Sequence, residues 1–148
     1  MKDNLIGISA DHAGYSLKEE VKKYLAEKGF EIKDYGAYED DTLDDYPDFG
    51  HPLGNAIESG EIIKGISFCG AGNGINIVAN KYPHVRSALC WKPEIAVLAR
   101  RHNDANICSI PARFVNIDEA IHIVSKFLDT KFDGGRHERL VEKIPIKD

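Results

Sequence analysis

Cysteines are scarce in this chain of 148 residues. It has three, Cys69, Cys90 and Cys108, and no Cys-x-x-Cys spacing. This pattern argues against a disulfide framework or a zinc site and indicates reduced thiols in a cytosolic protein. The N-terminus has only a short apolar run, too short for a signal peptide or a membrane span. We therefore expect a cytoplasmic location and no membrane partner.

An excess of basic residues is also absent. The chain has 19 Lys and Arg against 24 Asp and Glu, a net charge of −5. A general binder of nucleic acid or acidic membranes needs a basic face, so we expect neither partner, although a local basic pocket is allowed. Repeats, low-complexity segments and linkers are lacking too. The length then predicts one domain, residues 1–148.

Short apolar runs alternate along the chain with segments of helical periodicity. The expected strands are residues 4–9, 30–36, 64–69, 85–90 and 105–110. The expected helices are residues 15–29, 51–61, 73–82, 92–104 and 116–129, with a short basic helix in the tail. An acidic loop is expected over residues 37–50. This alternation predicts an α/β fold with a parallel sheet covered on both faces.

Side chains near the ends of these elements are the first candidates for a site, because ligands of parallel sheets bind beyond the carboxyl ends of the strands. The candidates are Asp11, His12, Cys69, His102, Asn103 and Arg113. Simpler interpretations stay open. Asp11 could only cap a helix, with His12 as a polar residue in its first turn. His102 could be a partly buried structural histidine.

The stretch FCGAGNGINIVANK, residues 68–81, contains a glycine-rich loop. Gly70, Gly72 and Gly74 can adopt backbone angles closed to other residues. Their N–H groups, with those of the following helix, can point at one anion. The G-x-G-x-G spacing matches neither a dinucleotide fold nor a nucleotide-triphosphate loop. The alternative is a tight strand-to-helix turn without a ligand.

Cys69 lies at the end of an expected strand and beside a helix N-terminus. That field lowers the pKa of a thiol and makes it a usable base or nucleophile. The alternative is a buried, inert thiol, since Cys is among the most buried residue types. Cys90 and Cys108 lie within apolar strands, and we assign them to the inert class.

The tail offers Arg136, His137 and Arg139 within four residues, after a Gly-Gly turn. Arginine presents the forked donors that a phosphate group needs. The alternative is a solvated helix face.

Six motifs together resemble one enzyme family: SADHAGYSLK, DYPDF, CGAGNGINIVANK, RHNDANI, PAR and FDGGRHER. Over nearly its whole length the chain resembles the type B ribose-5-phosphate isomerases and the related galactose- and allose-6-phosphate isomerases. The resemblance implies a three-layer Rossmann-like fold with a five-stranded parallel sheet. It implies an aldose–ketose isomerase that uses no metal or other cofactor and works through an enediol. It also implies a homodimer, or a tetramer of paired dimers, with an active site shared between two chains.

The resemblance also implies a role for each matching residue. Cys69 would be the base and His102 the group that opens the sugar ring. The substrate-binding residues would be Asp11, His12, Tyr46, Gly70, Ala71, Gly72, Asn73, Gly74, Asn103, Arg113, Arg136 and Arg139. The tail from about residue 131 to 148 would then carry phosphate-binding residues.

Three positions depart from the family pattern. Ala71 stands where many relatives carry Ser or Thr, so one hydroxyl donor is missing. Ile75 stands where relatives without the cysteine carry a glutamate base, which leaves Cys69 as the evident base. Leu140 stands where many relatives have a second arginine, and Arg139 comes one residue earlier, about 100° away on a helix.

The favoured function is the isomerisation of ribose-5-phosphate to ribulose-5-phosphate. An isomerase of a six-carbon sugar phosphate is the alternative within the enzyme class. A non-catalytic phosphosugar-binding subunit is an alternative of another class, and Ala71 and Leu140 favour it. The presence of Cys69, His102 and Asn103 argues against it, because binding alone needs neither a base nor a ring opener.

Overall fold

Five parallel strands form one sheet in the computed structural model, which describes residues 2–147. They are β1 (Leu5–Ala10), β2 (Glu31–Asp34), β3 (Lys64–Cys69), β4 (Ser87–Leu89) and β5 (Ile107–Pro111). Their order is β2-β1-β3-β5-β4, and Ile66 at the centre of β3 lies opposite Ile8 of β1 and Cys108 of β5. The expected five-stranded parallel sheet is confirmed.

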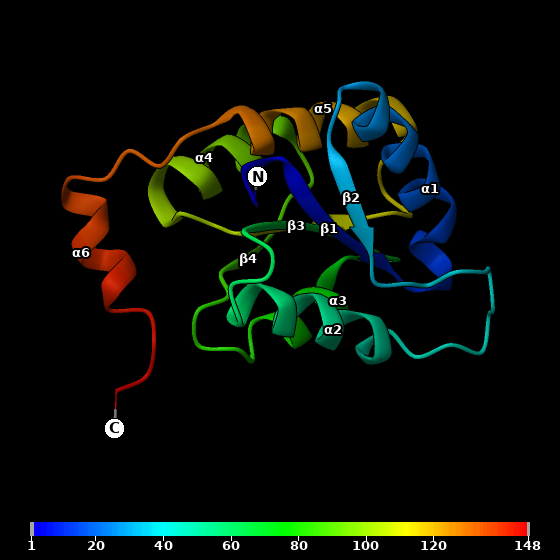
Figure 1. Ribbon diagram of the computed structural model, residues 1–148, viewed down its shortest axis with the longest axis horizontal. Coiled ribbons are helices and arrows are strands. Elements are labelled where there is room, and N and C mark those ends of the chain that lie inside the picture. The colour runs from blue at the N-terminus through cyan, green and yellow to red at the C-terminus, as the bar shows by residue number, and fades with distance from the viewer. Residues whose placement is uncertain (1, 148) are drawn as a thin grey trace.

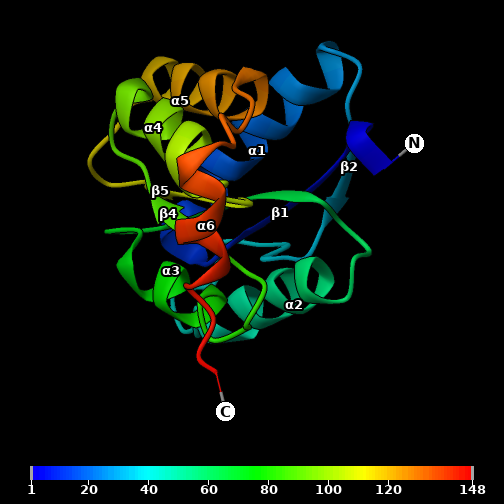
Figure 2. The ribbon, with the colours of Figure 1, turned by 90° about the vertical axis from the view of Figure 1, so that its left-hand side faces the viewer.

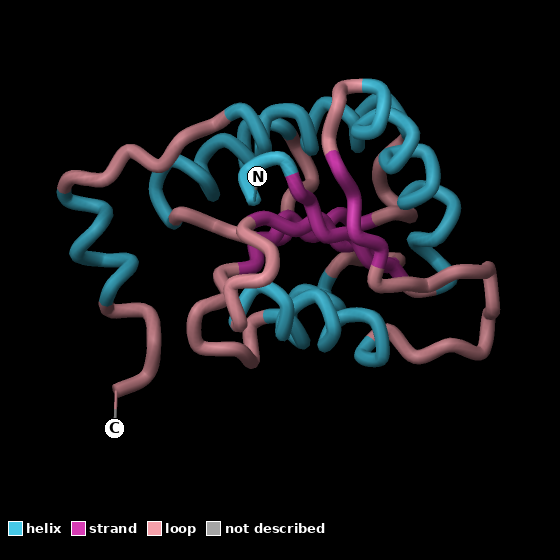
Figure 3. Tube along the Cα trace, in the orientation of Figure 1, coloured by secondary structure: helices cyan, strands magenta, loops and turns pink. Residues whose placement is uncertain are grey.

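Helices cover both faces of the sheet and make three layers, which Figures 1 and 3 show. One face carries α1 (His12–Glu27), α4 (Pro93–Asn103) and α5 (Ile117–Asp129). The other carries α2 (Pro47–Glu58) and α3 (Asn73–Ala79). A short 3-10 helix, η1 (Lys2–Asn4), precedes β1, and α6 (Arg136–Glu142) follows α5. Within residues 2–147, no helix is long and apolar enough to cross a bilayer.

The strand side chains are buried because helices lie against both faces. Ile6 and Ile8 of β1 pack with Phe68 of β3 and Phe127 of α5 in the larger core cluster. A second cluster under α2 is built around Leu53. Runs that are apolar at nearly every position are typical of such a doubly covered parallel sheet.

Two helices begin earlier than expected. The helix expected from residue 15 begins at His12, because the Asp11 carboxylate accepts a hydrogen bond from the Gly14 N–H and caps the first turn. The helix expected from residue 51 begins at Pro47, where proline suits the first turn since its missing N–H would have no partner there. Pro52 therefore lies inside α2 and not near its start.

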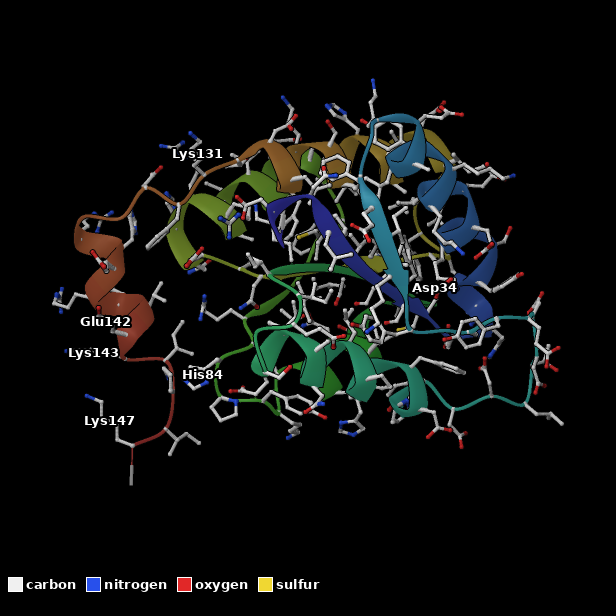
Figure 4. All side chains as sticks on the ribbon, in the orientation of Figure 1. Asp34, His84, Lys131, Glu142, Lys143 and Lys147 are labelled. Atoms are coloured by element: carbon white, nitrogen blue, oxygen red, sulfur yellow. The ribbon has the colours of Figure 1, made fainter. Side chains whose placement is uncertain are left out.

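The C-terminal segment leaves the three layers. In Figure 1, α6 stands apart from the sheet on the side of α4, and Figure 2 shows it in front of the edge that carries β4. Figure 4 places Glu142, Lys143 and Lys147 on this projecting segment. No residue of α6 is buried.

A buried lysine fixes the end of β2. Lys18 of α1 is fully buried, and its Nζ donates to both carboxylate oxygens of Asp34, at 2.9 and 2.8 Å, and to the carbonyl of Ala37. Lys22 donates to the same carboxylate at 2.7 Å. Burial raises the pKa of Asp34, but the hydrogen bonds from the two lysines and from the Gly36 N–H outweigh it and lower that pKa. These contacts anchor the loop that leaves Asp34, labelled in Figure 4.

Replacing Lys18 with methionine is expected to destabilise the fold by about 1–3 kcal/mol, because the partly buried carboxylate of Asp34 loses one of its two lysine partners and the Ala37 carbonyl loses its donor. Thermal unfolding measures the loss, and Lys23→Met is the control, since Lys23 is exposed and pairs with Glu20 on the surface. Because the pKa of Asp34 is lowered, its stabilisation is present above the unfolded pKa and is lost as pH falls. Equal melting temperatures for both variants would contradict this role.

Candidate active site

The carboxyl ends of β1, β3 and β5 bring part of the expected site together. The N–H of Asp11, which follows β1, donates to the Phe68 carbonyl of β3 at 3.3 Å. The N–H of Arg113, which follows β5, donates to the Gly70 carbonyl at 3.0 Å. Burial chiefly, and the charge of Asp11 in addition, raise the pKa of Cys69, and the charge of Arg113 opposes the upward shift of the His12 pKa. We call this group the thiol half-site: Asp11, His12, Asp44, Tyr46, residues 69–74 and Arg113.

The thiol of Cys69 is held within the backbone of the glycine loop. It is 5% exposed, and burial raises its pKa. Hydrogen bonds from the backbone N–H groups of Ile75, Gly72 and Gly74 act in the opposite direction and lower it. The expectation of a lowered pKa is wrong for the free chain, because desolvation of the thiolate outweighs the helix N-terminus. The N–H groups are nevertheless placed to stabilise a thiolate once it forms.

The glycines of the loop serve different purposes. Gly72 alone among the three has a positive φ, 77°, and caps α3. A side chain at Gly74 would come within 2.7 Å of the Tyr46 ring, so its absence lets Tyr46 close over the loop. At Gly70 a Cβ would lie 3.2 Å from the Arg113 guanidinium. The expectation of special backbone angles at all three is therefore corrected: Gly70 and Gly74 are sites of close approach.

Asp44 is a member of the half-site that the sequence did not reveal. Its Oδ1 accepts hydrogen bonds from the His12 backbone N–H at 3.1 Å and from His12 Nδ1 at 2.8 Å. This contact is the main cause that raises the pKa of His12. Asp44 lies in the acidic loop 37–50, where neither periodicity nor a motif distinguishes it from its neighbours. The adjoining DYPDF motif, which contains Tyr46, is the feature of this loop that indicated a functional site.

His102 and Asn103 lie near the amino ends of the strands, whereas Cys69 lies at the carboxyl end of β3. They end α4, which runs back from the carboxyl end of β4 and leads directly into the start of β5. The strand-end rule placed them with Cys69, and this is wrong within one chain, because a helix between parallel strands runs antiparallel to them. Figure 1 shows α4 and α6 on the side away from the start of α1.

His102 forms a second group with the C-terminal segment. Its ring stacks on that of His137 with centroids 4.4 Å apart, and Asp133 pairs with Arg101 at 3.2 Å. Loss of solvent and the charges of His102 and Arg136 lower the pKa of His137. Arg136 and Arg139 are exposed on α6. We call this group the histidine half-site: His102, Asn103, Asp133, Arg136, His137 and Arg139.

Both half-sites contain a trio of possible metal ligands. The ligand atoms of Asp11, His12 and Asp44 lie within 4.8 Å of one another, and so do those of His102, Asp133 and His137. In the first trio Asp44 is already bonded to His12, and in the second Asp133 is paired with Arg101. The metal-free chemistry implied by the resemblance remains a prediction.

The chain belongs to the ribose/galactose isomerase family, whose model matches residues 6–144. It is 38% identical over 139 residues to ribose-5-phosphate isomerase B of Escherichia coli, covering 94% of this chain and 93% of the relative. It is 41% identical to a probable ribose-5-phosphate isomerase B of Mycoplasma pneumoniae, with 94% and 91% covered.

Solved structures give the same family. The ribose 5-phosphate isomerase of Thermotoga maritima has a TM-score of 0.92 and 48% identity, with 95% of this chain and 97% of that chain covered. Ribose-5-phosphate isomerase B of Mycoplasma genitalium, solved with bound ribulose-5-phosphate, has a TM-score of 0.91 and 39% identity, with 95% and 93% covered. The recognised resemblance and the Rossmann-like fold are confirmed.

Proposed function

We propose that this chain is an aldose–ketose isomerase that converts ribose-5-phosphate to ribulose-5-phosphate. The observation that carries the proposal is Cys69, a thiol surrounded by backbone N–H groups at the carboxyl edge of the sheet, with Asp11, His12 and Arg113 beside it. The relative from Mycoplasma genitalium, which has the same fold, was solved with ribulose-5-phosphate bound. Ribulose-5-phosphate is the product of the proposed reaction.

Cys69 would take the proton from C2 of the open-chain sugar and return it to C1, since one group can reach both carbons. Negative charge develops on the two oxygens of the enediolate during the transfer. Preorganised donors of the half-site would stabilise that charge; in other enzymes the loss of one such donor costs about 10²–10³ in rate. Because Ala71 offers no hydroxyl, the backbone would act there alone. Ile75 is fully buried and apolar, so it offers no competing base.

Ring opening and part of the phosphate binding would come from a second copy of the chain. Cys69 lies at the carboxyl ends of the strands and His102 near their amino ends, so one chain does not bring a base and a ring opener together. In a symmetric homodimer, the histidine half-site of each chain would complete the thiol half-site of the other. His102 would carry the proton of the C1 hydroxyl to the ring oxygen as the bond between C1 and that oxygen breaks. Arg113 of the thiol half-site, with Arg136 and Arg139 of the second copy, would bind phosphate. The projecting α6 supports this arrangement, and further pairing to a tetramer stays open.

Steady-state isomerisation of ribose-5-phosphate and allose-6-phosphate, measured side by side, tests the function. We expect turnover of ribose-5-phosphate and a much lower kcat/KM for the six-carbon sugar. Preference for allose-6-phosphate would establish the six-carbon alternative. Turnover of neither, with stabilisation of the fold by phosphosugars, would favour the non-catalytic binding subunit.

Arg136→Ala is expected to raise the KM for ribose-5-phosphate about tenfold or more, since it removes a charge-assisted contact with the phosphate. The effect on kcat should be smaller. Steady-state kinetics measure both constants, and Lys143→Ala is the matched control, because it removes a positive charge from the same exposed segment. A KM that stays at the wild-type value would assign phosphate binding to other groups.

A further inference from the structure

Both hydrogen bonds that the structure shows for the Asp44 side chain are with His12. One oxygen, Oδ1, accepts from both the backbone N–H and the ring Nδ1 of His12, at 3.1 and 2.8 Å. Two bonds to one atom fix the position of the residue and the rotation of its ring together. Because Nδ1 carries the proton that points to the carboxylate, Nε2 is the ring nitrogen left for a ligand.

The other oxygen of this carboxylate is unpaired. The Asp44 side chain is 9% exposed, and its Oδ2 is buried without a hydrogen-bond partner among residues 2–147. A buried acceptor without a donor costs free energy. The unpaired oxygen therefore makes Asp44 less favourable for stability than a fully paired carboxylate would be, and a functional role is one explanation for such a group.

The loop that carries Asp44 is anchored at both ends. At its start, Lys18 binds the Ala37 carbonyl and Asp34, and the Ala37 N–H donates to the Ala10 carbonyl. At its end, the Tyr46 carbonyl accepts the first hydrogen bonds of α2. Because both ends of its loop are anchored, Asp44 can fix the position of the His12 ring.

We propose that Asp44 is a positioning residue, which fixes His12 as a protonated donor with its Nε2–H turned to an anionic oxygen of the sugar phosphate. This inference rests on the proposed function. Three charged groups face His12: Asp44 and Asp11 favour its protonated form, and Arg113 opposes it. Substrate anion and Asp44 would then lie on the two sides of one imidazolium ring.

The test compares Asp44→Asn with Asp40→Asn, a control that removes the same charge from an exposed position of the same loop. The asparagine keeps the shape of Asp44 but not its charge. We expect Asp44→Asn to raise KM for ribose-5-phosphate about tenfold, because a charged donor is weakened. The alkaline limb of kcat/KM should move to lower pH, while the melting temperature and the Asp40→Asn profile stay near wild type.

NMR titration of the His12 ring nitrogens supplies a readout that needs no turnover. We expect a protonated Nδ1 in the wild type and a lower His12 pKa in Asp44→Asn, with no change in Asp40→Asn. Coincident titrations and pH profiles for Asp44→Asn and the wild type would overturn the proposal. If the wild type itself did not isomerise any sugar phosphate, the proposed function would fail, and the titration would still decide the role of Asp44.

Discussion

Cys69→Ala is expected to lower kcat for ribose-5-phosphate by about 10³-fold or more, because a general base contributes roughly 10²–10⁴ to such proton transfers. Binding should change little, since Asp11, His12 and Arg113 remain in place. The thermal stabilisation of the variant by ribose-5-phosphate measures binding without turnover. The variant would then bind its substrate and leave it unchanged.

Cys90→Ala is the control for this experiment. Cys90 is also a buried thiol, but its Sγ contacts the Ala88 carbonyl near the β4 edge and not the glycine loop. Its turnover should stay near the wild-type value. Wild-type turnover in Cys69→Ala would remove Cys69 from the role of base.

The pKa of Cys69 also sets a direction for the pH dependence. Burial, opposed only in part by the loop N–H groups, raises that pKa above the ordinary value. The thiolate fraction of the free enzyme therefore grows as pH rises, and kcat/KM should rise with it on the limb that Cys69 controls. Alanine at position 69 would abolish that limb together with the activity.

The fold could be predicted from the sequence because short apolar runs alternate with amphipathic segments. That alternation indicated a parallel sheet and the helices on both faces. The order of the strands had no such signal, since β4 reaches the edge and β5 returns beside β3 through tertiary packing. The starts of α1 and α2 were missed for local reasons: Asp11 caps the first helix, and Pro47 occupies the first turn of the second.

The site was predictable where one rule applied and not elsewhere. The strand-end rule found Asp11, Cys69 and Arg113, because parallel strands all end at one edge. The rule was wrong for His102, because α4 runs back and ends near the amino ends of the strands. Asp44 could not be predicted, because its distinguishing feature is a hydrogen bond with His12, 32 residues away. A loop residue has no periodicity that would indicate such a contact.

The proposed division of the site between two chains has a large and specific consequence. His102→Ala is expected to lose most of its turnover, as is Cys69→Ala, since each would remove a proposed proton-transfer group. When the two variants are mixed so that the dimers reassort, half of the dimers are hybrids. Each hybrid has one site with an intact Cys69 and an intact partner His102. The mixture should therefore recover about one quarter of the wild-type activity.

A second mixture, Cys69→Ala with His12→Ala, is the control. Both changes lie in the thiol half-site, so every site in a hybrid is damaged and no recovery is expected.

The direct test of the account is therefore the isomerisation of ribose-5-phosphate by the reassorted mixture of Cys69→Ala and His102→Ala. Recovery to about one quarter of wild type, absent from the control mixture, is the predicted result for a site shared across a two-fold axis. Activity no greater than the sum of the separate variants would contradict it and place the whole site within one chain.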